Sequence, residues 1–395
     1  MPPRFLPLAS IVFLAACSTA PAESAAAGGD IDANGAHPET PLADAPFVVT
    51  RVTTFNEPWA MTFLPGTDNA LVTEKGGRLL LWRPGLGSLA VSNVPRPDVG
   101  GQGGLGDVVV APDFAASRMI YLSWVAAGPD GTHGAVVGRA TLLDGRDGKP
   151  ALGGLSIIWR QTPNVSGRGH FGHRIAFSPD GKYLFISSGE RQKFTPAQDM
   201  AANLGKIVRL NLDGSTPADN PFAAQGGVAA QIWSLGHRNP LGLTFDARGR
   251  LWNSEMGPEG GDELNLVTRG ANYGYPKASN GSHYGGKDIP DHAPGDGFAA
   301  PQLWWNPSVS PGGLMAYSGK MFPAWKDSLF MGALGGEALI RIDARGDAAH
   351  KAERWNMGNR IREVEEGPDG AIWLLTDGSG GELLKLTPKA GAPKP

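Results

Sequence analysis

The sequence predicts an all-β fold, a six-bladed β-propeller whose blades are four-stranded antiparallel sheets. The chain has 395 residues with 57 glycines and 33 prolines, which fall between short apolar runs as turns do in all-β proteins. One theme recurs in six copies: an apolar strand, a Pro-Asp or Asp-x-x-Gly turn, a second apolar or aromatic strand and, in several copies, a Gly-Gly-x-aliphatic strand. No copy could bury its apolar face alone, so the copies are expected to stack radially. The alternative is a pair of β-sandwiches whose copies resemble one another by accident.

The six copies follow one another in order along the chain. They begin at residues 58, 104, 170, 239, 310 and 360, and the last ends near residue 388. A further strand, FVVTRV at 47–52, is predicted to close the ring by joining the last blade. The propeller domain is therefore placed at 46–388, followed by a short tail at 389–395. Loops from several blades should meet over the central channel, where we expect a ligand.

The N-terminus has the pattern of an export signal. Arg4 precedes an apolar stretch too short to span a bilayer, and the run Leu-Ala-Ala-Cys ending at Cys17 resembles a bacterial lipoprotein processing box. We predict a signal peptide at 1–17 and a flexible tether at 18–45, rich in small and polar residues. The expected location is the periplasm, with a lipid anchor at the outer membrane. The alternative is an ordinary secretory signal in which Cys17 has no role.

Charge and composition exclude several classes of partner. The formal net charge is −3 and no basic stripe is present, so a nucleic-acid partner is not expected. Cys17 is the single cysteine, which rules out an intrachain disulfide. Membrane association is expected only through the lipid anchor, and the chain is expected to be a monomer.

Two histidines stand just before a predicted strand in GHFGHRIAF, at His170 and His173. Histidine at such a place serves as a metal ligand, as a catalytic base or as a structural residue. Zinc is disfavoured because no HExxH motif occurs and the one thiol lies at the export signal. The roles of base and structural residue remain open at this point.

Three other motifs need an interpretation. GQGGLG at 101–106 has the letters of a dinucleotide fingerprint, but a strand follows where that fingerprint needs a helix. SEMGPEGGDELN at 254–265 is rich in carboxylates and exposed backbone, which suits a calcium site or a solvated acidic loop. GHRNP at 236–240 and NRIRE at 359–363 place arginines at strand ends, where they could converge on a small polyanion.

Taken together, these motifs resemble those of the soluble aldose sugar dehydrogenases that depend on pyrroloquinoline quinone, in the glucose/sorbosone dehydrogenase family. The resemblance extends from about residue 46 to 388. The motifs that carry it occur in family order as GGQGGLGDVVVAPDF, GHFGHRIAF, GHRNPLGL, SEMGPEGGDELN, NYGYP and RIRE.

The resemblance implies a role for each matched residue. His170 would be the general base that takes the proton of the anomeric hydroxyl while hydride passes from C1 to the quinone, and His173 would be structural. The residues implied to hold the quinone are Gln102, Arg238, Asn239, Tyr284, Arg360 and Arg362. The backbone of Gly257 and Pro258 would hold the calcium ion of the cofactor, while Glu263 and Tyr273 match a second, structural calcium site.

One departure from the family pattern concerns the cofactor. LFMGALGG places Gly335 where the family commonly has a lysine. Loss of one charged contact is expected to weaken cofactor binding about ten- to a hundred-fold. Lys320 and Lys326 are candidates to replace it.

The implied reaction is the oxidation of an aldose to its lactone, with electrons passed to an external acceptor. Which aldose is preferred depends on loops such as 125–135 and 277–300, whose conformations the sequence does not give. Two alternatives remain: a calcium-dependent propeller lactonase that needs no quinone, and a lipid-anchored propeller that only binds a saccharide or protein.

Overall fold

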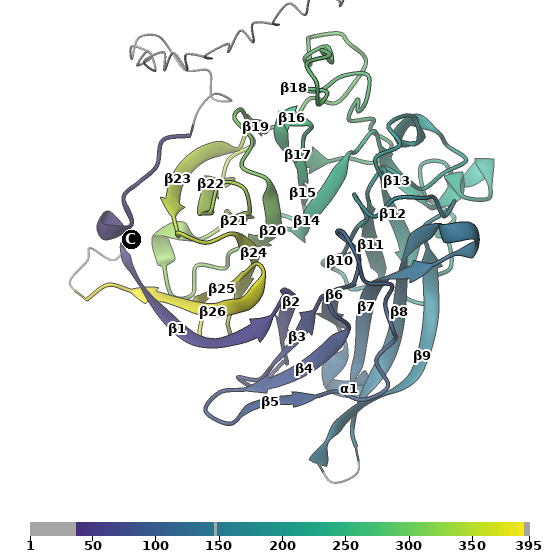
Figure 1. Ribbon diagram of the computed structural model, residues 1–395. Coiled ribbons are helices and arrows are strands. Elements are labelled where there is room, and N and C mark those ends of the chain that lie inside the picture. The colour runs from purple at the N-terminus through teal and green to yellow at the C-terminus, as the bar shows by residue number, and fades with distance from the viewer. Residues whose placement is uncertain (1–36, 146–147, 391–395) are drawn as a thin grey trace, which may run out of the picture. The chain divides into compact units, whose positions relative to one another are not determined.

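The computed structural model describes residues 37–145 and 148–390 and confirms the six-bladed β-propeller (Figure 1). Six four-stranded antiparallel sheets follow one another around a central axis, as the six copies in the sequence predict. The innermost strands β2, β6, β10, β14, β20 and β24 begin at residues 58, 105, 172, 239, 311 and 361. Cys17 and the first part of the predicted tether lie outside the described residues.

Each blade runs outward from its innermost strand. The first contains β2 (Pro58–Phe63), β3 (Ala70–Glu74), β4 (Arg78–Arg83) and β5 (Gly87–Ala90). The second contains β6 (Leu105–Val110), β7 (Met119–Ala127), β8 (His133–Asp144) and β9 (Pro150–Arg160). The third contains β10 (Gly172–Phe177), β11 (Tyr183–Ser188), β12 (Lys206–Asn211) and β13 (Ile232–Leu235).

The other three blades follow the same plan. The fourth contains β14 (Asn239–Phe245), β15 (Leu251–Met256), β17 (Asp262–Val267) and β19 (Leu303–Trp305), and β16 (Glu259–Gly260) pairs with β18 (Gly281–Ser282) beside it. The fifth contains β20 (Pro311–Ala316), β21 (Ser328–Ala333), β22 (Ala338–Asp343) and β23 (His350–Asn356). The sixth contains β24 (Ile361–Glu366), β25 (Ile372–Thr376), β26 (Ser379–Pro388) and β1 (Phe47–Asn56).

Helical segments are short and lie in the connections between strands. They are α1 (Phe114–Ser117) and the 3₁₀ turns η1 (Leu42–Asp44), η2 (Pro129–Gly131), η4 (Thr195–Gln198), η5 (Ala223–Gln225), η6 (Ala229–Gln231) and η7 (Pro323–Trp325). Within the described ranges, none of these has the length and hydropathy to cross a membrane.

The ring is closed by β1, as predicted from the FVVTRV segment. This strand pairs antiparallel with β26, from Phe47 opposite Pro388 to Asn56 opposite Ser379 (Figure 1). Residues 37–45 belong to the predicted tether, and the structure places them against the fifth blade. Thr40 forms a bridge with Trp355, and Glu39 lies 3.3 Å from the guanidinium of Arg354.

Apolar side chains fill the spaces between neighbouring blades. Separate buried clusters join consecutive blades, including one that joins the sixth blade to the first through Trp373 and Trp82. Burial of apolar surface between sheets is what stabilises a structure whose single blades have no core of their own.

The antiparallel order of the strands decides where functional side chains gather. In each blade the start of the innermost strand and the end of the second strand lie at the same edge of the sheet. Residues just before the first strand and just after the second strand of six blades therefore meet at one end of the hub.

Below that end, a buried guanidinium ties the hub together. Arg174 forms ion pairs with Asp107 and Glu363, and lies 4.1 Å from the centre of the Trp59 ring. Its Nε also donates to the carbonyl of Leu241. These partners come from four other blades, so this one side chain fixes the innermost strands of five blades relative to one another.

Candidate active site

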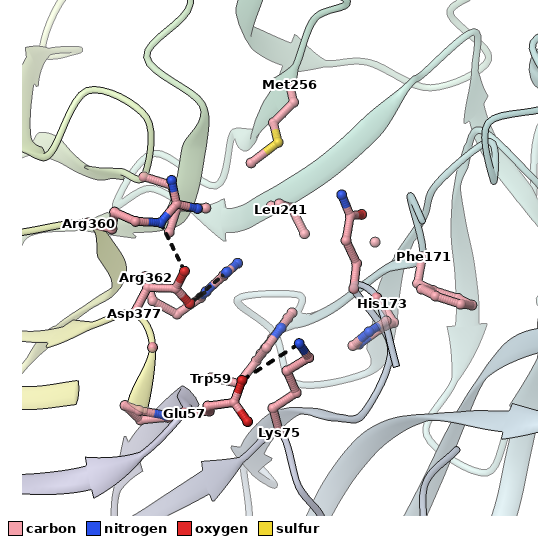
Figure 2. A pocket seen from close by; sticks show the side chains of 16 residues that line it. Glu57, Trp59, Lys75, Phe171, His173, Leu241, Met256, Arg360, Arg362 and Asp377 are labelled. Atoms are coloured by element: carbon pink, nitrogen blue, oxygen red, sulfur yellow. Dashed lines mark hydrogen bonds and ion pairs between the residues drawn. The ribbon is translucent and has the colours of Figure 1, made fainter. Parts of the chain in front are cut away.

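A cavity of about 260 Å³ opens at the end of the hub where the innermost strands begin (Figure 2). Every blade contributes to its lining. Examples, in blade order, are Trp59, Gln102, His173, Met256, Leu334 and Arg362. The cavity therefore lies where the sequence predicted a ligand.

Cationic side chains outnumber carboxylates in the lining of the cavity by three to two. Lys75, Arg360 and Arg362 line the cavity together with two carboxylates, Glu57 and Asp377. Asp377 accepts from Arg360 Nε at 3.1 Å, and from Arg362 Nε and Nη2 at 3.0 and 2.8 Å. Burial raises the pKa of Asp377, but the positive charge of Arg362 outweighs this and leaves the pKa below its usual value. The predicted arginine pair thus shares one ionised carboxylate.

Gln102 connects the cavity to His170. The side-chain Oε1 of Gln102 accepts from the backbone N–H of His170 at 2.7 Å, and the backbone N–H of Gln102 donates to the carbonyl of Arg168 at 2.8 Å. His170 has a φ of +49°, an unusual conformation for a residue with a side chain. The side chain of Gln102 therefore helps to hold the backbone of His170 in a conformation that would otherwise be unfavourable.

Glu190 is the main residue of the site that sequence reasoning missed. Its Oε1 accepts from His170 Nδ1 at 2.5 Å, and the carboxylate also accepts from the backbone N–H groups of Gln192, Lys193 and Phe194 at 2.6–2.8 Å. Gln192 and Phe194 have positive φ angles. One carboxylate thus holds both the imidazole and an unusual turn.

These hydrogen bonds determine the state of His170. Burial would raise the pKa of Glu190, but hydrogen bonds from His170 and the turn keep it below the usual value, so the carboxylate is ionised. An ionised carboxylate only accepts, so Nδ1 of His170 carries a proton and Nε2 is the basic nitrogen of the neutral ring. Burial lowers the pKa of His170; Glu190 opposes that shift and the charge of Arg238 adds to it. The imidazole is therefore neutral near pH 7.

Arg191 fixes the loop that carries His170. Its guanidinium is fully buried and donates to the carbonyls of Gly167, Gly169 and His133. It also lies 3.8 Å from the centre of the Phe171 ring. Arg191 therefore holds the residues on both sides of His170.

Arg238 and Asn239 lie beside the cavity and have unused polar atoms. Nη1 of Arg238 donates to the carbonyls of Met256 at 3.0 Å and Gly257 at 2.5 Å. Arg238 Nε and Asn239 Oδ1 are buried without a hydrogen-bond partner among the described residues. Tyr284 is 73% exposed, with its ring centre 5.7 Å from the Arg238 guanidinium. The structure thus groups these predicted residues near Met256, which lines the cavity.

The backbone predicted to hold the cofactor's calcium adjoins this group. The carbonyl of Gly257 accepts from Arg238, and its N–H donates to Asp262 at 2.9 Å. Pro258 is buried next to it. Over residues 37–145 and 148–390, no three His, Cys, Asp or Glu side chains are grouped as metal ligands. A calcium ion here would depend largely on carbonyl oxygens, which that ion accepts readily.

Glu263 and Tyr273, the second predicted pair, lie around His237. The ring of Tyr273 stacks on that of His237 at 4.7 Å, and His237 Nδ1 lies 3.1 Å from Glu255. The Tyr273 hydroxyl is already used, because it donates to the carbonyl of Leu266 and accepts from the N–H of Thr268. His237 therefore links Tyr273 to Glu255, which is the cross-strand neighbour of Glu263.

Glu255, which sequence reasoning missed, faces Glu263 across the β15–β17 pair. Burial raises the pKa of Glu255 to about 8, and burial together with Glu255 raises that of Glu263 well above its usual value. Buried oxygens of Asn253 and Asn265 on the same strands have no partner among the described residues. Such a group of oxygens suits a hard cation.

His173 fits the predicted structural role. Its ring stacks on Trp59 at 4.9 Å, and its Nδ1 lies 2.8 Å from the hydroxyl of Ser123. Burial, followed by the charge of Arg174, lowers its pKa to about 3. The ring is therefore neutral and forms part of the cavity wall.

The two lysines suggested as replacements at Gly335 do not line the cavity, so that suggestion is wrong. Lys320 binds the carbonyl of Pro368, and both Lys320 and Lys326 are exposed. Leu334, next to Gly335, does line the cavity. The lysine that lines it is Lys75, which follows β3 in the first blade.

Comparison with known proteins agrees with this geometry. Residues 55–385 match the family model described as Glucose / Sorbosone dehydrogenase. The chain belongs to this family. By this membership it is an oxidoreductase of the sugar dehydrogenase type.

Two named relatives are similar to this chain along most of its length. Aldose sugar dehydrogenase YliI of Escherichia coli (strain K12) is 43% identical over 342 residues, covering 85% of this chain and 91% of the relative. Quinoprotein glucose dehydrogenase B of Acinetobacter calcoaceticus is 29% identical over 441 residues, covering 85% and 89%.

Solved structures show the same fold. The apo form of the soluble aldose sugar dehydrogenase of Escherichia coli has a TM-score of 0.82 at 40% identity, covering 87% of this chain and 100% of that one. The PQQ-bound aldose sugar dehydrogenase of Streptomyces coelicolor has a TM-score of 0.72 at 29% identity, covering 90% and 100%.

Proposed function

We propose that the protein is a calcium-dependent quinoprotein that oxidises the C1 hydroxyl of aldose sugars to lactones and passes the electrons to an external acceptor. The observation that carries this proposal is the pairing of a neutral His170 with Glu190 beside a cavity rich in cations. The names of the relatives support an aldose as substrate and a quinone as cofactor.

The residues present fit pyrroloquinoline quinone, which carries three carboxylates. Three cations line the cavity, and the unpartnered Nε of Arg238 lies beside it. Arg360 and Arg362 would bind carboxylates, while Gln102, Arg238 and Asn239 would bind the quinone side, with Tyr284 over the ring. Charge-assisted hydrogen bonds of this kind are about twice as strong as neutral ones.

The chain's own part in the reaction is to move a proton. When bound, the quinone supplies a two-electron acceptor for the hydride of C1, and calcium makes it more electrophilic. His170 Nε2 accepts the proton of the C1 hydroxyl, so that the C1–O bond becomes the carbonyl of the lactone. Glu190 keeps Nδ1 protonated and stabilises the imidazolium that forms. Arg191 and Gln102 hold the backbone of His170 in place for this transfer.

Calcium would occupy two places. The carbonyls of Gly257 and Pro258 would hold the ion at the cofactor, and Glu263, with Glu255 beside it, would hold the structural ion near Tyr273. The raised pKa values of the two glutamates support the second place, because a cation would replace the protons they otherwise share.

Removal of calcium should destabilise the protein more at high pH than at low pH. In the metal-free protein the folded-state pKa of Glu255 is about 8, above its usual value of 4.5. Below pH 4.5 the side chain is protonated in both the folded and the unfolded state, so the shift costs no stability. Between pH 4.5 and pH 8 only the unfolded state releases the proton, so the free energy of unfolding falls as the pH rises. Melting temperatures with EDTA and with Ca²⁺ at pH 5 and pH 8 should therefore differ most at pH 8. Glu263→Gln should lose most of this calcium effect, while Asp180→Asn, on an exposed turn, should keep it. Equal calcium effects at both pH values would contradict the assignment.

The proposal is tested by reconstitution. Purified protein incubated with pyrroloquinoline quinone and Ca²⁺ should reduce an electron-accepting dye when glucose is added, and should not do so without the quinone. Hydrolysis of a lactone without quinone would favour the lactonase. Sugar binding without dye reduction would favour the non-catalytic propeller. Export to the periplasm with a lipid on Cys17, and a monomeric state, remain part of the proposal.

A further inference from the structure

We propose that Lys75 is a cofactor-binding residue, and that its ammonium group binds a carboxylate of the quinone in place of the lysine that is missing at Gly335. This inference rests on the proposed function. It concerns the one lysine among the residues that line the cavity.

The three cations in the cavity differ in the hydrogen bonds that they already form. Arg360 and Arg362 both hydrogen-bond to Asp377. The Nζ of Lys75 approaches Glu57 at 3.9 Å, which is beyond hydrogen-bond distance, and it has no hydrogen bond to any described residue. Lys75 is thus the one cation of the three whose charged group forms no hydrogen bond to a described residue, and all three donors of its ammonium group are unused.

The location of Lys75 suits an anionic ligand. Its side chain is 26% exposed and that of Glu57 is 43% exposed, so Lys75 is the more sheltered of the two. Figure 2 shows Lys75 and the two arginines entering the same space from different sides. A ligand with several carboxylates could therefore contact the three cations at once. The positive charges give no such advantage to a neutral ligand.

The backbone of Lys75 is fixed on both sides before any ligand arrives. Its N–H donates to the carbonyl of Glu57 at 2.9 Å, and its carbonyl accepts from the N–H of Leu105 at 3.0 Å. Gly104 packs against it so closely that a Cβ there would lie 2.3 Å from the Lys75 carbonyl oxygen and 2.6 Å from its Cγ. This gives a structural reason for one glycine of the GQGGLG segment. A residue whose backbone is already held in place has less freedom to lose when a ligand binds.

Among the described residues that line the cavity, the fifth blade contributes no cation. Leu334 lines the cavity there, and a Cβ at Gly335 would lie 2.7 Å from the hydroxyl of Ser310. The position is therefore tight for a longer side chain unless Ser310 moves. The first blade supplies the charge through Lys75 instead.

The test is the affinity for the quinone itself. Full-length apo-protein with Ca²⁺ is titrated with pyrroloquinoline quinone in a calorimeter at two salt concentrations. Lys75→Met, which keeps the length of the stem and removes the charge, should raise the Kd about ten- to a hundred-fold. The Kd of the variant should also depend less on salt. Lys75→Arg should restore most of the affinity.

Controls separate this inference from the proposed function. Lys320→Met removes a lysine outside the cavity and should bind the quinone as the parent protein does. Circular dichroism and melting temperature verify that each variant is folded. If Lys75→Met binds as tightly as the parent protein, the inference is wrong while the proposed function stands. If the parent protein binds no quinone, both are wrong.

Discussion

Replacing His170 with alanine is expected to lower turnover about 10²- to 10⁴-fold while the protein still binds the quinone. This range is the usual contribution of a general base. His170 is not one of the residues proposed to hold the quinone. Its Nδ1 is bound to Glu190, and its ring is nearly buried. Turnover is measured by dye reduction with glucose, and cofactor binding by calorimetry.

The pH profile gives a second measure of the same residue. Because burial holds the pKa of His170 below its usual value of 6.5, kcat/KM should be lost only as the pH falls below that value. His350→Ala, at an exposed histidine on β23, is the matched control and should leave both turnover and profile unchanged. Normal turnover in quinone-loaded His170→Ala would show that another group is the base.

Replacing Glu190 with alanine is expected to reduce the free energy of unfolding by about 3–5 kcal/mol and to slow turnover as well. Removal of one member of a buried charged network commonly costs this much, and here the imidazole and three backbone N–H groups lose their acceptor. Turnover falls because nothing then keeps the proton on Nδ1 of His170. Urea denaturation and dye reduction measure the two effects.

Two variants make this prediction specific. Glu190→Gln keeps the volume and an acceptor oxygen, so it should fold better than the alanine variant and still turn over slowly, because an amide stabilises an imidazolium poorly. Glu39→Ala removes a half-exposed glutamate that pairs with Arg354, and should cost about 0–1 kcal/mol. A Glu190→Ala protein as stable and active as the parent would contradict the assigned role.

The sequence predicts the inner strands well and the outer strands poorly. The first strands of all six blades begin within two residues of the predicted copies, because each opens a copy of the recurring theme and at least half of its residues are buried. The fourth strands β5, β9 and β23 were not predicted, since much of their surface is exposed and little apolar pattern remains. The exception is β1, whose apolar and β-branched residues are evident in FVVTRV.

The candidate site follows a similar division. Residues before the first strand of a blade, such as Gln102, His170 and Arg238, lie in recognisable motifs and were predicted. Residues after the second strand, such as Lys75 and Glu190, lie in turns whose sequence resembles an ordinary polar connection. Their role depends on which turns meet at the hub, and only the assembled ring supplies that information.

The pairing of Phe47 with Pro388 has a consequence for how the protein folds. Nearly the whole polypeptide must be made before β26 exists to receive β1, so the last join is a contact between distant parts of the sequence, a kind that forms slowly. Between its synthesis and its pairing with β1, β26 presents an unpaired edge, which is prone to pair with other chains. Refolding at high concentration is therefore the condition under which this propeller should aggregate most.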